Sequence, residues 1–112
     1  DGVIEADWLA KWNHYMPKKV ALTDGHTGRQ WSYAELFQIA NAVAHRLETQ
    51  HKIQKGDRVA LLSANELESI ALFFATSRIG ALLVPINHRL SGTEIDYILD
   101  NSQAKLLVHS EE

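Results

Sequence analysis

The sequence predicts an α/β protein, with an N-terminal hairpin followed by a βαβαβ-type parallel sheet with packed helices. The first observation is a set of three short apolar runs, at residues 59–62, 81–86 and 106–108, typical of strands covered on both faces. The second is that segments of helical periodicity alternate with these runs, and a capping signal precedes each of those segments. Such alternation favours parallel pairing with right-handed crossovers.

The first element is predicted to be a helix over residues 4–15. Trp8, Leu9 and Trp12 recur at helical spacing. Pro17 should end this helix, because the residue before a proline avoids the α region.

A hairpin is predicted next. Residues 19–23 alternate as a strand does, residues 24–28 are turn formers, and residues 30–32 are expected to pair back as a short second strand. Trp31 lies in that second strand. We expect it and the two tryptophans of the first helix to pack that helix against the hairpin rather than to stack a nucleobase, since no basic residues interleave with the three rings.

A long helix should follow the hairpin and end near Thr49. Ser32 and Glu35 form a capping box, in which each side chain accepts the other residue's backbone N–H. The periodicity places one apolar stripe on the helix. Its members are Leu36, Ile39, Ala40, Val43 and Leu47.

The middle of the chain predicts a turn at residues 55–57 and a buried strand at residues 58–63. Residues 65–68 carry a second capping signal. The helix behind it is apolar over more than one stripe, so it should be buried on more than one side. Gly80 is placed where a glycine commonly follows a helix.

The last third predicts a strand at residues 81–86, a third capping box at residues 91–94, a helix closed by residues 101–102, and a strand at residues 105–109. Pro85 has no N–H donor, so it belongs at a strand end or on a sheet edge.

Composition excludes several classes of protein. The 112 residues suit one domain, and 46% hydrophobic with 22% charged residues exclude a disordered tail. A net charge of -3 argues against nucleic-acid binding, and the absence of cysteine excludes disulfides, thiolate metal sites and a cysteine nucleophile. The longest apolar runs are too short for a transmembrane segment. No signal peptide is visible either, and we expect a cytoplasmic protein.

Candidate binding groups follow the predicted strands. The turn at residues 63–65 leads into a helix N-terminus, where anions can bind, but we favour an ordinary N-cap over an anion site there. His88 follows a strand in the sequence PINHR, where α/β folds place ligand groups, but we favour an ordinary loop residue as its interpretation. Asn87 and His109 occupy similar positions.

The remaining polar residues indicate no catalytic centre. The sequence contains neither GxGxxG nor GxxxxGK[ST], and its six histidines form no HxxxH or HExxH pair. Glu66, Glu68 and Glu94 fall in first helical turns and complement the helix dipole. His45 is expected on a solvated helix face. The residues alone therefore predict a fold and no catalytic, cofactor-binding or metal residue.

Several short motifs nevertheless run along nearly the whole chain. They are WSYAEL at residues 31–36, KGDRVA at 55–60, GALLVPIN at 80–87, TEIDYIL at 93–99 and AKLLV at 104–108. In this order and spacing the sequence resembles the extreme N-terminal region of the adenylate-forming enzymes. The likeness is greatest to the acyl-CoA synthetases (AMP-dependent synthetases and ligases).

The resemblance implies a two-step reaction for a longer parent enzyme. A carboxylate attacks the α-phosphate of Mg·ATP to give an acyl-adenylate and pyrophosphate, and a thiol, usually that of coenzyme A, then displaces AMP. Within this family, the overall sequence pattern of residues 82–90 favours a fatty acyl-CoA ligase, of the long-chain fatty-acid–CoA ligase type. Peptide-synthetase adenylation domains, acetyl-CoA synthetases and aryl-CoA ligases share much of the pattern.

The same resemblance places the family's Pro-Lys phosphate loop, its nucleotide and magnesium contacts and its catalytic lysine downstream of this sequence. We therefore expect residues 1–112 to be a single N-terminal subdomain fragment, inactive alone, with ATP, Mg2+ and coenzyme A bound by the parent only. A chain that starts at Asp1 without a methionine fits that expectation. Its expected partners are the remainder of the parent and, through an exposed apolar face, a second copy of itself.

Two other interpretations stay open at this point. One is a small stand-alone flavodoxin-like α/β binding or regulatory module, which would need an acidic or flavin-binding site at the strand ends. The other is a pure protein-interaction module.

Overall fold

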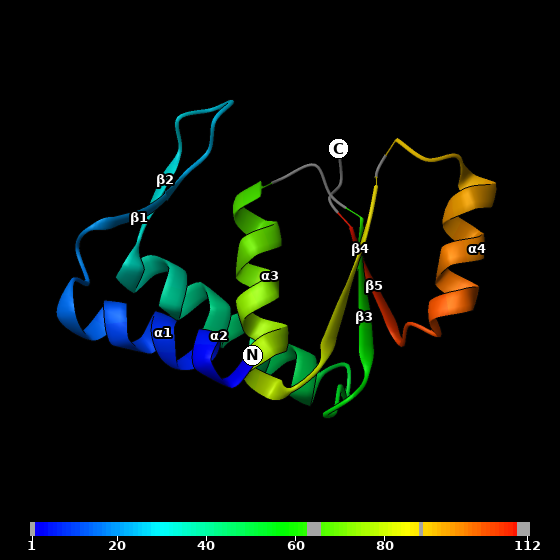
Figure 1. Cartoon of the computed structure of the whole chain (residues 1–112), viewed down its shortest axis with the longest axis horizontal. Coiled ribbons are helices and arrows are strands. Elements are labelled where there is room, and N and C mark those ends of the chain that lie inside the picture. The colour runs from blue at the N-terminus through cyan, green and yellow to red at the C-terminus, as the bar shows by residue number, and fades with distance from the viewer. Residues whose placement is uncertain (1, 63–65, 88, 110–112) are drawn as a thin grey trace.

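A computed structural model describes residues 2–62, 66–87 and 89–109, with side chains from residue 9 onward in these ranges. Helices lie on both sides of a small parallel sheet, and a helix and a hairpin precede that sheet along the chain (Figure 1). The elements in chain order are α1 (Gly2–Tyr15), β1 (Val20–Thr23), β2 (Gln30–Ser32), α2 (Tyr33–Thr49), β3 (Arg58–Leu62), α3 (Glu66–Ile79), β4 (Leu82–Ile86), α4 (Gly92–Ser102) and β5 (Leu106–His109).

The main sheet has the strand order β4-β3-β5, and both neighbours run parallel to the central β3. Val59 of β3 lies opposite Leu83 on one side and Leu106 on the other. Helices α3 and α4 lie on opposite faces of this sheet (Figure 1). The two crossovers therefore have the same hand, as expected for consecutive βαβ units. The predicted α/β class and hairpin are confirmed, and β1 and β2 pair antiparallel.

Two apolar clusters form the core. The larger lies between the sheet and helices α2 and α3, with Val59 and Ala75 fully buried at its centre. The smaller joins α1, α2, α3 and the hairpin through Leu9, Leu36 and half-buried Trp31. Helix α3 contributes to both clusters, which confirms that it is covered on more than one side.

Helix α4 is attached more loosely. Its predicted apolar residues Ile95, Ile98 and Leu99 are only half-buried, and none of its eleven residues, all of which are described, is fully buried. Tyr97 on this helix is 69% exposed. The face of the sheet beneath α4 is thus less completely covered than the face beneath α2 and α3.

The helix boundaries follow local signals. The Ser32 hydroxyl accepts the Glu35 N–H at 3.1 Å, and the Glu35 carboxylate accepts the Ser32 N–H at 2.9 Å. Ser91 and Glu94 form the same capping box at α4. The signal at residues 65–68 lies partly outside the described residues.

The apolar stripe of α2 differs in detail from its prediction. Leu36, Ala40 and Leu47 are buried, but Ile39 and Val43 are only half-buried. Ala44, which the predicted stripe omitted, is buried instead. The two half-buried residues border a groove, described below, that helices and strands leave uncovered.

Trp12 and Trp31 lie where the first helix meets the following elements. Trp12 stacks on Tyr33, the first residue of α2, with ring centroids 6.0 Å apart. Trp31 packs in the same cluster as Leu9 of α1, so the expected packing of helix against hairpin is confirmed there. The side chain of Trp8 lies outside the described residues. In the described part of the chain, no helix is long and apolar enough to cross a membrane.

Candidate functional site

The carboxyl ends of the parallel strands are where α/β proteins usually bind ligands. Two of the predicted candidates are described there. The Asn87 side-chain oxygen accepts the Arg89 N–H at 2.9 Å, and its backbone carbonyl accepts the Leu90 N–H at 3.2 Å, so this residue shapes the turn after β4. His109 is exposed at the end of β5. The turn at residues 63–65 and His88 lie outside the described residues.

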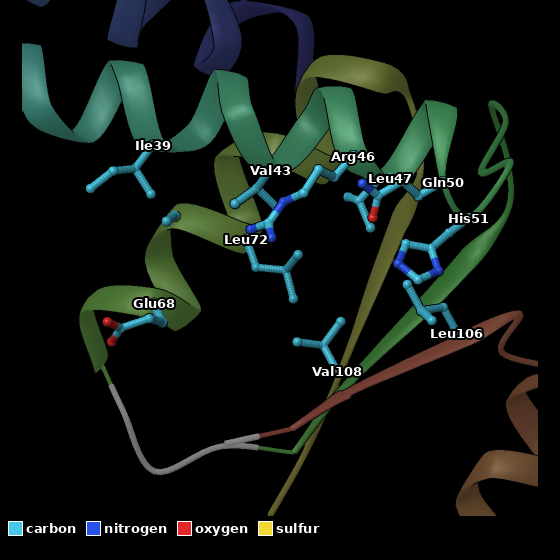
Figure 2. Close-up of a pocket in the computed structure, with 11 residues that line it drawn as sticks. Ile39, Val43, Arg46, Leu47, Gln50, His51, Glu68, Leu72, Leu106 and Val108 are labelled. Atoms are coloured by element: carbon cyan, nitrogen blue, oxygen red, sulfur yellow. The ribbon is translucent and has the colours of Figure 1, made fainter. Parts of the chain in front are cut away.

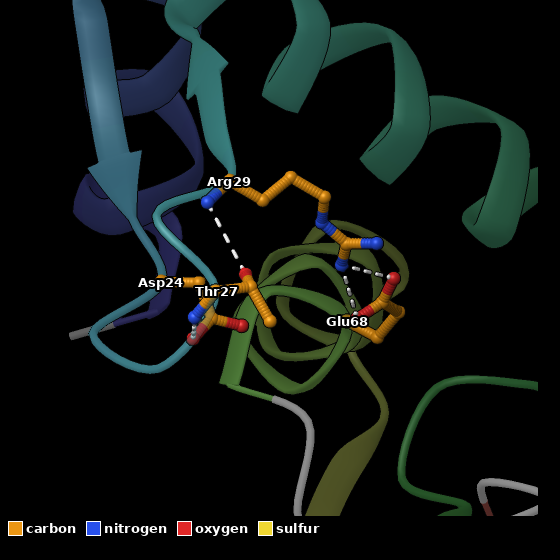
Figure 3. Close-up of polar contacts among 4 residues, drawn as sticks. All are labelled: Asp24, Thr27, Arg29 and Glu68. Atoms are coloured by element: carbon orange, nitrogen blue, oxygen red, sulfur yellow. Dashed lines mark hydrogen bonds and ion pairs between the residues drawn. The ribbon is translucent and has the colours of Figure 1, made fainter.

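The first turn of α3 carries an ion pair to the hairpin (Figure 3). Arg29 Nη2 donates to both carboxylate oxygens of Glu68, at 2.8 and 3.0 Å. The Arg29 guanidinium also lies over the Trp31 ring, 5.7 Å from its centroid. Both partners of the ion pair are about half exposed, so its main effect is to hold the hairpin loop beside the start of α3.

The hairpin loop is organised by Asp24 (Figure 3). Its buried carboxylate accepts the backbone N–H of His26 at 2.8 Å and that of Thr27 at 3.3 Å. These hydrogen bonds, that of His26 first, hold the pKa of Asp24 below its ordinary value. A carboxylate that is ionised and occupied by loop amides stabilises the turn and is a poor general base.

The K-G-D-R segment is also structural. The Asp57 carboxylate accepts the Gln54 N–H at 2.7 Å and the Lys105 ammonium at 3.2 Å, and these contacts, the first above all, lower its pKa. Lys105 Nζ also donates to the Lys52 carbonyl at 2.6 Å. Arg58 donates to the Ser102 carbonyl at the end of α4, at 3.0 Å. The hydrogen bonds between Gln54 and Asp57 form the predicted turn into β3. The motif also connects this turn to Lys105, just before β5, and to the end of α4.

A groove of about 310 Å³ lies between α2, α3 and β5 (Figure 2). Its floor is apolar, and polar side chains stand at its rim. The apolar lining consists of Ile39, Val43, Leu47, Ala71, Leu72, Leu106 and Val108, and the polar lining of Arg46, Gln50, His51 and Glu68. The sequence predicted Ile39 and Val43 only as members of the apolar stripe of α2. Helical periodicity cannot show which residues of such a stripe stay uncovered where α2, α3 and β5 meet.

Within the described ranges, no group of three or more His, Asp or Glu lies close enough to hold a metal ion. His45 is exposed on α2, as predicted.

Acidification should destabilise the chain through its hydrogen-bonded carboxylates. Asp24, Asp57 and Glu94 each have a pKa below the ordinary value in the folded state. The unfolded chain then binds more protons, so this stability is complete above the unfolded pKa values, near 3.8 for the two Asp and 4.5 for Glu94, and is lost as the pH falls through the folded values. Urea unfolding at about pH 6 and about pH 3 should show a lower free energy of unfolding at the acidic pH.

Asp24→Asn separates the contribution of Asp24 from the rest. An asparagine still offers an oxygen to the loop amides but cannot titrate, so the acid-dependent loss should become smaller. The matched control is Asp96→Asn, at an exposed position of α4, which should follow the unsubstituted chain. An unchanged acid dependence for Asp24→Asn would contradict the assigned role of Asp24.

The chain is similar in sequence to proteins of known family. The family described as AMP-binding enzyme matches residues 9–112. The chain is 39% identical over 93 residues to the long-chain-fatty-acid–CoA ligase FadD13 of Mycobacterium tuberculosis, a match over 83% of this chain and 18% of that protein. It is 49% identical over 82 residues to crotonobetaine/carnitine–CoA ligase of Salmonella paratyphi A, over 73% of this chain and 16% of that protein.

The structural match covers more of the chain. A crystal structure of the N-terminal domain of FACL13 from M. tuberculosis superposes with a TM-score of 0.85 and 35% sequence identity, over 93% of this chain and 26% of that one. The chain thus spans less than a fifth of the length of the curated relatives named above.

Proposed function

The chain belongs to the AMP-binding enzyme family, and on that premise we propose that residues 1–112 are the N-terminal subdomain of a fatty acyl-CoA ligase. The observation that carries the proposal is the superposition of 93% of the chain on the N-terminal domain of FACL13 at 35% identity. Such an enzyme activates a carboxylate with ATP as acyl-AMP and transfers the acyl group to coenzyme A. The proposal places it in the cytoplasm.

The role of this subdomain within the ligase is that of a scaffold. Motif residues with describable contacts are engaged in turns and caps: Ser32 and Glu35 cap α2, Asp57 closes the turn before β3, and Asn87 shapes the turn after β4. Among the described residues no three or more His, Asp or Glu side chains are grouped so that they could hold a metal ion. We therefore propose that no residue of this segment takes part in the chemical steps. The contacts to the nucleotide, the metal ion and coenzyme A are assigned to the rest of the enzyme.

Carboxylate-dependent exchange of pyrophosphate into ATP tests this proposal. The native reading frame is first followed beyond the codon for Glu112 and the longer protein is produced beside the 112-residue chain. The longer protein should catalyse exchange that requires a fatty acid, because reversible adenylation returns labelled pyrophosphate to ATP. The 112-residue chain, shown to be folded by circular dichroism, should catalyse none.

Two results would overturn the proposal. A reading frame that stops near Glu112 would remove the ligase and leave the stand-alone binding module as the interpretation to pursue. Fatty-acid-dependent exchange by the 112-residue chain alone would show that the segment is a catalyst in its own right.

A further inference from the structure

The end of α1 and the turn into β1 form an exposed corner of the molecule (Figure 1). Residues 14–20 are seven consecutive exposed residues, and three of them, Tyr15, Met16 and Val20, are large and apolar. The Tyr15 side chain is 67% exposed. Single apolar residues scattered over a surface are normal, but a cluster of them is typical of a site that contacts another surface.

The same segment is basic in a chain that is acidic. Residues 8–23 contain three lysines, Lys11, Lys18 and Lys19, and no acidic residue. The remaining residues contain eight Lys or Arg against fourteen Asp or Glu. All three lysines are exposed, and none takes part in the ion pairs described above. Their charges are therefore available to an anionic partner.

We infer that residues 11–20, the basic corner, bind the surface of a membrane that contains anionic lipids. Lys11 lies one helical turn before Tyr15, so the two side chains share a face of α1. The other two lysines separate Met16 from Val20 along the chain. Long lysine side chains can hold their ammonium groups at lipid phosphates while neighbouring apolar side chains enter the boundary between headgroups and acyl chains.

Hydrogen bonds already order the backbone of the basic corner. The Lys19 N–H donates to the Met16 carbonyl at 3.2 Å within the turn. The first two residues of α2 hold the turn from outside. The Tyr33 N–H donates to the Lys19 carbonyl at 3.0 Å, and the Ala34 N–H donates to the Pro17 carbonyl at 2.9 Å. A turn of fixed shape loses little conformational entropy on binding, and its paired backbone groups cost less to remove from water.

Charge elsewhere on the chain does not prevent this contact. The molecule is 44 Å long, and Figure 1 shows the basic corner and α4 at opposite ends of that axis. Exposed charges are screened over about 8–10 Å at physiological ionic strength, so the acidic residues of α4 are too distant to repel a membrane at the corner. Glu35, next to Ala34, is closer, but three lysines outnumber it.

A nucleic acid fits this surface less well than a membrane does. Single strands bind by stacking successive bases on aromatic side chains along a basic groove. Trp12 is half-buried and stacks on Tyr33, and the His14 ring meets the Tyr15 ring edge-on. The flexible aliphatic chain of Met16 offers a base no flat face but suits the acyl-chain boundary of a bilayer.

Co-sedimentation with lipid vesicles tests the inference. The 112-residue chain, and the longer protein where the reading frame continues, are mixed with vesicles of phosphatidylcholine alone or of phosphatidylcholine with phosphatidylserine. Both proteins should bind the vesicles that contain phosphatidylserine far more strongly, and added salt should reduce that binding. A short single-stranded DNA is the probe for the other class of partner, and it should not bind.

Lys18→Gln combined with Lys19→Gln should lower the partition coefficient on phosphatidylserine vesicles about 30-fold, since each lysine near an anionic surface contributes roughly fivefold. The matched control is Lys52→Gln combined with Lys55→Gln. It removes two exposed lysines from the loop before β3, far from the basic corner, and should change the coefficient less than about twofold. Circular dichroism should show both variants folded, because all four side chains are exposed.

Tyr15→Ser tests the apolar part of the basic corner. It should lower the partition coefficient at least about fivefold, because the ring no longer enters the lipid boundary. Tyr97→Ser is the matched control, since Tyr97 is 69% exposed on α4 and lies at the other end of the molecule. That variant should bind vesicles as the unsubstituted chain does.

The inference is overturned by absence of vesicle binding, by equal binding to both kinds of vesicle, by equal losses in the test and control variants, or by binding of the DNA alone. Binding by the 112-residue chain that the longer protein lacks would also overturn it, because the rest of the enzyme would then cover the basic corner. None of these results bears on the exchange assay, so failure of the membrane contact and failure of the proposed ligase are distinguishable.

Discussion

Replacing Leu67 by Ala is expected to lower the free energy of unfolding by roughly 2–5 kcal/mol, the usual cost of emptying a buried leucine site. Leu67 is 1% exposed in the first turn of α3, the helix that packs against both α1 and α2. The substitution removes apolar contacts and leaves a cavity that this central helix cannot easily fill. Because small domains are stabilised by only about 5–15 kcal/mol, this loss is a large part of the total.

Leu82→Ala makes the same chemical change at a position that is 52% exposed on the edge strand β4. It should therefore cost much less, since little apolar surface is removed from the core. Urea unfolding followed by far-ultraviolet circular dichroism measures both variants, and their dependence on urea concentration should stay the same. Equal losses in the two variants would contradict the central position assigned to Leu67.

Local interactions explain which parts of this fold could be predicted. The capping boxes at Ser32 and Ser91 each involve residues three positions apart, so the sequence carries the complete signal. The alternation of apolar runs with helical segments likewise predicted parallel strands. The strand order β4-β3-β5 was not predicted, because spacing along the chain does not say which strand is central.

Long-range contacts explain what could not be predicted. Arg29 and Glu68 are 39 residues apart, and Glu68 had an adequate local explanation as a first-turn carboxylate. Asp57 and Lys105 are 48 residues apart and meet only because β3 and β5 are neighbours. The groove depends on how three elements leave Val43 and Leu106 uncovered. At the candidate ligand edge, only Asn87 and His109 of the predicted residues are described.

Gly80→Ala is expected to lower the free energy of unfolding by about 1–2 kcal/mol, because Gly80 ends α3 in the left-handed region, with φ of 77°. Its N–H donates to the Ser77 carbonyl, and the next N–H, that of Ala81, donates to the Thr76 carbonyl. An added Cβ would also lie 3.0 Å from Lys55 Cγ. That atom belongs to a flexible, exposed side chain, so backbone strain should exceed the cost of the contact.

Two further glycines separate the effect of backbone strain from the effect of a contact made by the added Cβ. Gly56 has φ of 88°, but an added Cβ would meet no described atom within 4 Å, so Gly56→Ala should show the strain alone, at about 1 kcal/mol. Gly25 has neither a positive φ nor a near neighbour, and Gly25→Ala should change stability by less than about 0.5 kcal/mol or raise it slightly. Denaturant midpoints should therefore fall in the order Gly25→Ala, Gly56→Ala, Gly80→Ala. If Gly80→Ala matched Gly25→Ala, the left-handed end of α3 would contribute nothing to stability.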